Sequence, residues 1–519
     1  MQSYALTVDK FLDHAAKWWG DREIVTGGGG RIGYAALRAR SNRLSGALAK
    51  LGLRFGDRIA TLAWNTQHHL EIYYGAMGAG FVCHTLNPRL TVAHLAAMVN
   101  EAEDRVLAVG SGLSDLALEL VFHCPSIEAV VLLDGTHAEL RSISDRRTFA
   151  FEDLLVGLGE ETKWGGFDEE TPAGLCYTSG TTGAPKGVLY THRSNYLHTL
   201  RALQADAIAL TSADSVLVAV PMFHANGWGF PFAAPAVGAK IVLPGRHADG
   251  AHLARLICEE GVTVAAGVQT VWLGLMDYLD ATGGDVPTLE RVLIGGSPCS
   301  DALIQRMEER LQARVQTSWG MTELSPLGTA APARDTQRAV GAGRLAVGLD
   351  LKLTDASGAT LPQQRNVTGH LKVKGASVVD RYFKATADAL DSEGYFDTGD
   401  LATIDDEGNL TISGRSKDLI KSGGEWINPA EIESIVGQLP GVGQVAVIGR
   451  ADPKWGERPI LVVEPQKSHT LDDDVLLDAL RGNVADWWIP DRVIQVVHMP
   501  LAATGKIDKN RLRAEYAGA

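Results

Sequence analysis

A stretch rich in glycine and hydroxyl side chains, residues 177–187, contains the residue types that bind phosphate. Its sequence is Tyr177-Thr-Ser-Gly-Thr-Thr-Gly-Ala-Pro-Lys-Gly187. Glycine lets backbone N–H groups approach a ligand closely, and successive N–H groups form an anion-binding concavity. The hydroxyls add donors, and the ammonium of Lys186 adds a point charge. A Gly-rich stretch alone is as readily a turn, but the apolar run Gly174–Tyr177 before it predicts a buried strand, which favours a phosphate loop.

The spacing within this phosphate loop differs from that of the nucleotide triphosphatases. Their motif requires Gly-x-x-x-x-Gly-Lys followed by Ser or Thr. Here the lysine stands three residues after Gly183 and is followed by Gly187. The candidate phosphate ligands are Thr178, Ser179, Gly180, Thr181, Thr182, Gly183 and Lys186.

A second polar cluster, Gln316-Thr-Ser-Trp-Gly-Met-Thr-Glu323, offers groups for a base, a phosphate and a metal. The Trp319 ring could stack on a base, and Thr322 could donate to a phosphate. Glu323 could hold Mg²⁺ through oxygen. Taken alone, Trp319 is more often a core aromatic, because tryptophan is highly buried on average.

Two further stretches place charged groups on either side of a turn-rich segment. Gly394-Tyr-Phe-Asp-Thr-Gly-Asp400 puts a carboxylate just before Leu401, where we expect a strand to begin. A carboxylate can accept both hydroxyls of a ribose, although Asp-Thr-Gly-Asp alone is typical of a polar turn. Gly414-Arg-Ser-Lys-Asp418 follows about fifteen residues later. The occurrence of both stretches at this separation is a more specific signal than either stretch alone.

The C-terminal part of the chain contains two candidate loops. Lys421-Ser-Gly-Gly-Glu-Trp-Ile-Asn428 has two adjacent glycines, and Pro500-Leu-Ala-Ala-Thr-Gly-Lys506 ends in a lysine. An exposed lysine is ordinarily a solvated charge, because lysine is almost never buried without a partner. Thr504-Gly505 would instead form a tight loop that projects Lys506 into a cleft.

Together these stretches resemble the motifs of the adenylate-forming superfamily, which comprises acyl-CoA synthetases, adenylation domains and firefly-type luciferases. Five motifs occur in the expected order, and the resemblance extends from Gly56-Asp-Arg58 to Lys506. It implies that the phosphate loop holds the β- and γ-phosphates of ATP. It also implies that Lys506 is the catalytic lysine and that Thr178 and Glu323 bind Mg²⁺.

The resemblance also assigns the remaining nucleotide and CoA contacts. The cluster 316–323 binds adenine, although the family usually has Tyr where this chain has Trp319. Asp400 is the ribose ligand and Arg415 its companion. Lys417 is the hinge of a mobile C-terminal domain, and the loop at Gly423 and Gly424 lines the pantetheine channel. The implied nucleotide-binding and CoA-binding residues outside the phosphate loop are Gly296, Ser297, Ser318, Trp319, Gly320, Met321, Thr322, Asp400, Arg415, Lys417, Gly423, Gly424 and Trp228.

Two segments resemble the walls of the family's acyl pocket, Val220–Trp228 and Gly295-Gly-Ser-Pro298. His224 stands where amino-acid-activating members carry an Asp for the substrate ammonium. A histidine cannot supply the same fixed negative charge, so we expect a substrate without an α-amino group. The sequence Phe-His-Ala-Asn-Gly-Trp is most similar to the medium-chain fatty acid and 3-methylmercaptopropionate CoA ligase branch. In it, His224 and Trp228 would close the tunnel between acyl group and thiol.

The elements that must position these groups follow from buried runs alternating with helical spacing. Strands are predicted at 58–64, 106–109, 130–133, 216–220, 241–243, 262–266 and 292–294, and helices at 34–51, 252–260 and 301–312. This alternation indicates α/β layering with largely parallel sheets. Residues 346–412 form a small β-rich module. We therefore expect an N-terminal AMP-binding domain over 1–414, built of two packed α/β subdomains and this module, and a mobile α/β domain over 415–519.

Length and composition set the limits on function. A chain of 519 residues is longer than a single hydrophobic core usually accommodates, so two or more domains are expected. The net charge of −14 argues against nucleic acid and anionic membranes as partners. The cysteines show no metal-binding spacing and fit a reducing cytoplasm, which is the expected location: Cys83, Cys124, Cys176, Cys258 and Cys299. The start of the chain lacks a signal-peptide pattern, and no apolar run predicts a membrane span.

The expected function is ATP-dependent ligation of a carboxylic acid to CoA through an acyl-adenylate. A short- to medium-chain fatty acid or 3-methylmercaptopropionate is the favoured acid, and an aryl acid is the alternative. ATP, Mg²⁺ and CoA are the implied cofactors, and a homodimer is one option for the oligomeric state. Three other classes stay open: a domain that loads a carrier protein, a luciferase-like monooxygenase, and a catalytically inactive binding protein. No carrier segment follows Lys506, which disfavours the first.

Overall fold

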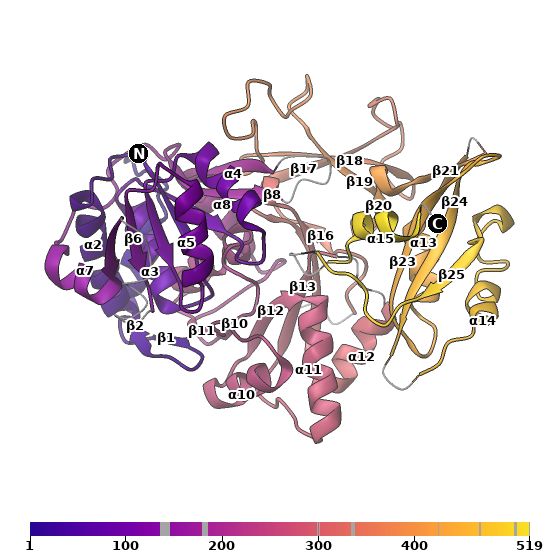
Figure 1. Ribbon diagram of the computed structural model, residues 1–519, viewed down its shortest axis with the longest axis horizontal. Helices are drawn as coiled ribbons and strands as arrows, with labels where there is room; N and C mark the ends of the chain where they lie inside the picture. The colour runs from indigo at the N-terminus through magenta and orange to yellow at the C-terminus, as the bar shows by residue number, and fades with distance from the viewer. Residues whose placement is uncertain are drawn as a thin grey trace.

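The computed structural model describes residues 1–134, 146–178, 185–297, 299, 301–333, 338–423, 425–466, 469–502 and 506–517. Figure 1 shows the N-terminal two-thirds of the chain as one large body, with the C-terminal sheet in yellow beside it. Every helix in the described ranges is too short or too polar to cross a bilayer.

The first sheet has seven strands in the order β7-β6-β5-β3-β4-β8-β9. Its strands are parallel except for the antiparallel pair β8–β9, which flanks the predicted phosphate loop in the sequence. Their bounds are β3 (Arg58–Leu62), β4 (Val82–Leu86), β5 (Val106–Val109), β6 (Ala129–Leu132), β7 (Arg147–Ala150), β8 (Pro172–Thr178) and β9 (Lys186–Thr191).

The second sheet has nine strands in the order β16-β15-β14-β13-β12-β10-β11-β1-β2. Its centre, from β14 to β1, is parallel, so the carboxyl ends of β12, β13 and β14 meet at one edge. Its bounds are β1 (Glu23–Thr26), β2 (Arg31–Gly33), β10 (Ser215–Val218), β11 (Lys240–Leu243), β12 (Val264–Val268), β13 (Arg291–Gly295), β14 (Arg314–Gly320), β15 (Leu327–Ala330) and β16 (Arg344–Leu345).

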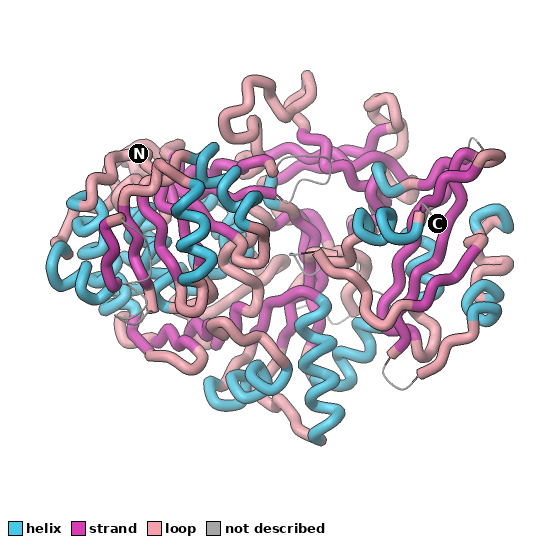
Figure 2. Tube along the Cα trace, in the orientation of Figure 1, coloured by secondary structure: helices cyan, strands magenta, loops and turns pink. Residues whose placement is uncertain are grey.

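Helices cover both sheets, and one large core joins them. That core contains Ile59 and Ala108 of the first sheet together with Val216 and Ile241 of the second. Figure 2 shows helices in cyan against the strands in magenta. The helices of the large body are α1 (Asp9–Trp18), α2 (Tyr34–Lys50), α3 (Gln67–Gly78), α4 (Val92–Ala102), α5 (Ser114–His123), α7 (Phe151–Leu158), α8 (His192–Ala202), α9 (Phe230–Val237), α10 (Gly250–Glu260), α11 (Gln269–Thr282) and α12 (Asp301–Leu311), with 3₁₀ turns η1 (Ala225–Gly229) and η2 (Thr322–Leu324).

Helix starts are fixed by local capping. Thr91 accepts a hydrogen bond from the backbone N–H of His94, and Asp249 accepts one from His252. Thr191 and Ser194 form a reciprocal capping box at the start of α8. Such caps satisfy backbone donors that the helix leaves unpaired, typically by about 1 kcal/mol each. They fix where each helix leaves its strand.

The β-rich module is a four-stranded antiparallel sheet in the order β17-β18-β19-β20. Its bounds are β17 (Leu349–Thr354), β18 (Thr368–Gly375), β19 (Phe396–Ile404) and β20 (Leu410–Arg415). Asp400 therefore lies inside β19. The expectation of a strand beginning just after Asp400 was wrong, because the pairing of β18 with β19 already includes Phe396 and Asp397.

The C-terminal sheet has the order β22-β21-β24-β23, and β25 pairs with β24. The module ends at Arg415 and this sheet begins at Ile420, with Lys417 on the 3₁₀ turn between them. The elements are η3 (Ser416–Asp418), β21 (Ile420–Ser422), β22 (Glu425–Ile427), α13 (Pro429–Val436), β23 (Val442–Asp452), β24 (Gly456–Pro465), α14 (Asp473–Asp478), η4 (Asp486–Trp488), β25 (Arg492–Gln495) and α15 (Lys509–Tyr516).

The predicted strands and helices are all present. β3, β5, β6, β10, β11, β12 and β13 occupy the seven predicted strand regions, and α2, α10 and α12 the three helical ones. The mixed α/β class with a small β module is confirmed. The boundary at 414/415 and the mobility of the C-terminal part stay predictions.

Candidate active site

The buried carboxylate of Asp400 is the point at which three segments meet. Trp319 Nε1 donates to one carboxylate oxygen at 2.9 Å, and Arg415 Nε lies 2.8 Å from the other. Arg415 stands directly opposite Asp400 across β19 and β20, and its Nη1 donates to the carbonyl of Thr398 at 2.9 Å. Asp400 is 2% exposed. Burial raises its pKa, while Arg415 and the indole N–H lower it.

Trp319 was expected to offer a stacking face, and the structure adds a hydrogen bond. Its side chain is 8% exposed and packs against Gly328, where an added Cβ would lie 2.4 Å from the indole ring. This packing aims the N–H at Asp400. Tyrosine has no indole N–H, so the tryptophan at position 319 is the sequence feature that could have pointed to this hydrogen bond.

Glu323 is a second buried carboxylate, 7% exposed, on η2 at the end of β14. The hydroxyl of Tyr382 donates to its Oε1 at 2.9 Å. Burial raises the pKa of Glu323, and Tyr382, Arg415 and Lys186 lower it. The Nζ of Lys186 lies 4.9 Å from the centre of the Tyr382 ring. The motifs did not include Tyr382, because it lies in the loop between β18 and β19.

Lys506 reaches from the C-terminal part to the large body. A Cβ built on Gly296 would lie 3.7 Å from its Cε and 3.9 Å from Trp228 Cζ2. The pKa of Lys506 is lowered because surrounding protein disfavours its ammonium and Arg415 repels it, although Asp400 and Glu323 attract it. Lys506 is nevertheless an exposed residue, so water reaches its side chain. The structure thus brings together Lys506, Asp400, Arg415 and Glu323.

The turn that carries Trp228 has an unusual backbone. Ala225, Asn226 and Trp228 have φ values of 41°, 53° and 55°, in the left-handed region that non-glycine residues rarely adopt. Asn226 Nδ2 donates to Asn195 Oδ1 at 3.3 Å, which helps hold the turn. Several strained residues in succession are typical of a functional site.

Small residues make room for the Trp228 ring. A Cβ on Gly295 would lie 3.1 Å from Trp228 Cη2 and 2.7 Å from Ser318 Oγ. His224 lies earlier in the same segment, with its ring edge-to-face against Phe223 at 4.8 Å between centroids. The predicted acyl-pocket residues Trp228, Gly295 and Gly296 therefore lie together.

Other predicted residues lie at the ends of strands β8, β13 and β14. Thr178 ends β8 directly opposite Lys186, and Ser318 Oγ donates to the carbonyl of Ile294 at 3.1 Å. The carbonyl of Thr322 accepts from the hydroxyl of Tyr190 at 2.8 Å. Gly320 and Met321 lead into the turn at Pro326, and Ser297 is half-buried after β13.

Two predicted parts make their contacts elsewhere. Gly423 donates its N–H to the carbonyl of Trp455 at 2.7 Å, within the C-terminal sheet. Lys417 is an exposed residue, and its pKa is lowered, chiefly because the neighbouring protein partly desolvates its ammonium. Ser179, Gly180, Thr181, Thr182, Gly183 and Gly424 lie outside the described residues. The roles of all these residues remain predictions.

The donor set fits a Mg²⁺ ion held mainly by a nucleotide. Within the described ranges no group of three or more His, Cys, Asp or Glu side chains could hold a metal. Mg²⁺ usually binds through one or two carboxylates and substrate phosphates. Glu323 can supply that carboxylate, and Thr178 stays the predicted hydroxyl ligand.

Substitution Trp319→Phe removes the indole donor and leaves an aromatic face. The affinity for AMP should fall about tenfold, because a lost hydrogen bond to a charged group costs roughly 1.5–3 kcal/mol. The loss should be smaller for 2′,3′-dideoxy-AMP, which cannot engage Asp400. Trp164→Phe is the control, since that indole is equally buried at 8% and donates to Ser45 Oγ at 2.8 Å. If calorimetry showed the same loss of affinity for both nucleotides, the proposed role of Trp319 in orienting Asp400 toward the ribose would be contradicted.

Comparison with known proteins identifies the family. A model described as "AMP-binding enzyme" matches residues 12–383, and "AMP-binding enzyme C-terminal domain" matches residues 431–506. The chain is 41% identical to a 3-methylmercaptopropionyl-CoA ligase of Ruegeria lacuscaerulensis, covering 100% of this chain and 99% of the relative. It is 40% identical to a medium-chain-fatty-acid–CoA ligase of Ectopseudomonas oleovorans, covering 99% and 97%.

Solved structures agree at the level of the fold. The anthranilate CoA ligase AuaEII in complex with anthranoyl-AMP matches with a TM-score of 0.89 and 22% identity, over 99% of this chain and 98% of that one. ATP-bound MatB from Rhodopseudomonas palustris matches with a TM-score of 0.86 and 26% identity, over 98% and 99%. The chain therefore belongs to the AMP-binding enzyme family, within the adenylate-forming superfamily that its motifs resemble.

Proposed function

We propose that this protein is an AMP-forming acyl-CoA ligase that acts on a short- to medium-chain fatty acid or on 3-methylmercaptopropionate. The observation that carries the proposal is the position of Lys506 against Gly296, beside Asp400 and Glu323. An ammonium there can act on the same nucleotide that the carboxylates hold. The names of the full-length relatives support the acid class.

The proposed first step joins the acid to the nucleotide. A carboxylate is ionised at neutral pH, with a reference pKa of about 4, so it needs no general base. It attacks the α-phosphorus of ATP, and the bond to pyrophosphate breaks. Both partners are anions, so positive charge must be preorganised around the reacting phosphate. Lys506 supplies it from the C-terminal side, and Lys186 lies at the phosphate loop.

Asp400 and Trp319 orient the nucleotide during this step. With its two oxygens already bound to Trp319 and Arg415, the carboxylate is fixed in one rotamer and keeps free lone pairs for the ribose hydroxyls. When bound, Mg²⁺ would neutralise phosphate charge beside Glu323. His224 and Trp228 form one wall of the pocket for the acyl chain.

In the proposed second step, the CoA thiol attacks the acyl carbonyl and AMP leaves. Lys506 must then withdraw to make room, which we assign to rotation about Lys417. This movement brings Gly423 and Gly424 toward the pantetheine channel. Separate arrangements for the two steps also keep water from the reactive anhydride.

The remaining properties belong to the same proposal. The partners are the acid, ATP and CoA, with Mg²⁺ as the metal. The cysteines at Cys83, Cys124, Cys176, Cys258 and Cys299 are free thiols, which suits a reducing cytoplasm. A homodimer stays a prediction.

A panel of acids tests the function directly. The purified enzyme is incubated with ATP, Mg²⁺ and straight-chain C2–C12, methylthio-alkanoic or aryl acids, with and without CoA. We expect AMP and the acyl-CoA in equal amounts, with the highest kcat/KM among C4–C10 or methylthio-alkanoic acids. A preference for aryl acids would favour the alternative ligase, and AMP without thioester would contradict CoA ligation.

Substitution Lys506→Ala should separate the two steps. Acyl-adenylate formation should fall by at least about a thousandfold, because a preorganised charge at the reacting phosphate is lost. Thioester formation from supplied acyl-adenylate should stay within about threefold of the wild type. Lys509→Ala is the matched control, because Lys509 pairs with Glu433 at 2.6 Å within the C-terminal domain. If Lys506→Ala lowered the rates of both half-reactions equally, the proposed alternation between two domain arrangements would be contradicted.

The pH dependence follows from the shifted pKa values. The ammonium of Lys506 is lost as pH rises through its lowered pKa, so kcat/KM for ATP should fall on the alkaline side below pH 10.5. Burial raises the pKa values of Asp400 and Glu323. The fall of kcat/KM on the acid side should therefore occur at a higher pH than the titration of an exposed carboxylate. The measurement is a pH profile at limiting ATP. An alkaline midpoint at or above 10.5 would contradict it.

A further inference from the structure

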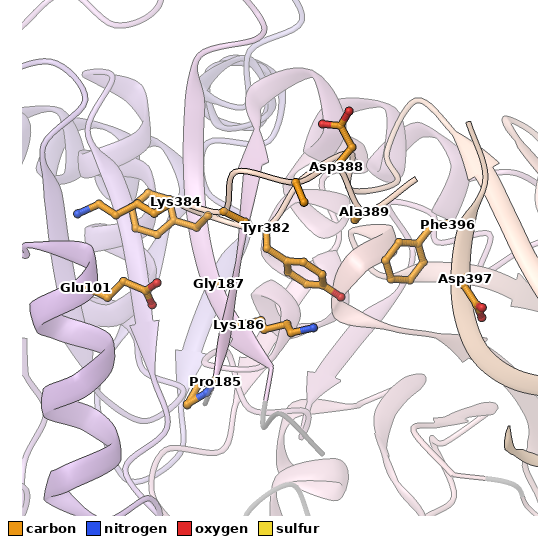
Figure 3. A pocket seen from close by; sticks show the side chains of 13 residues that line it. Glu101, Pro185, Lys186, Gly187, Tyr382, Lys384, Asp388, Ala389, Phe396 and Asp397 are labelled. Carbon is orange, nitrogen blue, oxygen red and sulfur yellow. The ribbon is translucent and has the colours of Figure 1, made fainter. Parts of the chain in front are cut away.

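Tyr382 joins two groups at the phosphate end of the proposed site. Its hydroxyl donates to Glu323 Oε1 at 2.9 Å, and its ring lies 4.9 Å from Lys186 Nζ. Figure 3 shows the Lys186 ammonium and the Tyr382 hydroxyl pointing the same way. We propose that Tyr382 is a positioning residue that aligns Glu323 and Lys186 on the metal-bound phosphates of ATP. This inference rests on the proposed function.

The hydrogen bond decides which carboxylate oxygen faces the ligand. A carboxylate has two oxygens, and the Tyr382 hydroxyl occupies Oε1. The proposal assigns Oε2 to the cation, because the hydroxyl already engages one lone pair of Oε1. A group that hydrogen-bonds a metal ligand fixes its orientation, and losing such a group typically weakens metal binding roughly 10- to 100-fold.

The segments that carry Tyr382 and Glu323 are tied together. The N–H of Val379 donates to the carbonyl of Glu323 at 2.8 Å. Ser377 Oγ donates to the carbonyl of Leu324 at 3.2 Å, and Arg201 Nη1 donates to Ser377 Oγ at 2.8 Å. Arg201 belongs to α8, so the large body supports both segments. The Tyr382 hydroxyl consequently meets Glu323 at a fixed distance.

The ring of Tyr382 also forms a wall. A cavity of about 550 Å³ is lined by Lys186, Tyr382, Phe396 and Asp397, among others, and Glu323 is not part of its lining. Tyr382 therefore contributes to the lining of the cavity and also contacts Glu323. A cation over an aromatic face gains about 0.5–1 kcal/mol at exposed sites, which favours one direction for the exposed Lys186 chain.

Substitution Tyr382→Phe tests the hydroxyl alone, because it keeps the ring beneath Lys186. The probes are Mg²⁺ with α,β-methylene-ATP, which cannot transfer its adenylate, and AMP, which lacks the β- and γ-phosphates. Calorimetry should show the Kd of the magnesium complex rising about tenfold. The Kd of AMP should change less than twofold, because Asp400 and Trp319 are untouched.

Tyr395→Phe is the matched control. Tyr395 belongs to the same module, and its hydroxyl donates to the Asp350 carboxylate away from Glu323. This variant should bind both nucleotides as the wild type does. Tyr382→Leu, which also removes the ring, should weaken the magnesium complex beyond Tyr382→Phe.

Two outcomes would overturn the inference. One is an unchanged Kd for the magnesium complex in Tyr382→Phe, and the other is an equal loss for AMP, which indicates general disturbance of the site. Either result leaves the proposed function intact if the wild type makes acyl-CoA. A wild type that binds neither nucleotide would instead contradict the proposed function itself.

Discussion

The site depends on keeping one buried carboxylate charged. Asp400 is 2% exposed, and taking such a group out of water costs several kcal/mol unless donors replace the water. Trp319 from the nine-stranded sheet and Arg415 from β20 supply those donors. Because the three groups come from separate segments, the contact fixes the β module against the sheet that carries the predicted adenine motif. The contacts that keep Asp400 charged are thus the same contacts that hold the β module in place.

The same charges bear on the role that we propose for Lys506, which comes from another part of the chain. Across the described ranges Lys506 forms no ion pair within 4.0 Å, and it experiences attraction from Asp400 and Glu323 and repulsion from Arg415. These opposing effects leave the ammonium available to a new anion. A firm salt bridge would hold Lys506 in place and oppose the withdrawal that we propose for the second step. The absence of such a salt bridge in the described ranges is therefore compatible with the proposed movement of Lys506 into and out of the site.

Local patterns predicted the framework well, and the contacts between distant segments escaped them. Buried β-branched runs located β3, β10 and β13, because apolar periodicity reflects burial directly. The Trp319–Asp400 hydrogen bond joins residues 81 apart, and the Tyr382–Glu323 bond joins residues 59 apart. Neither is encoded in a local motif. Asp400 was placed at a strand start because Asp-Thr-Gly is turn-like, whereas pairing with β18 extends the strand through it.

Exchange of label between pyrophosphate and ATP tests most directly whether these groups act on one nucleotide to make an acyl-adenylate. Enzyme, Mg²⁺, ATP and labelled pyrophosphate are mixed with acid in the absence of CoA, and labelled ATP is measured. The account predicts exchange that requires the acid and proceeds without CoA. Exchange that needs CoA, or steady thioester synthesis without any exchange, would contradict it.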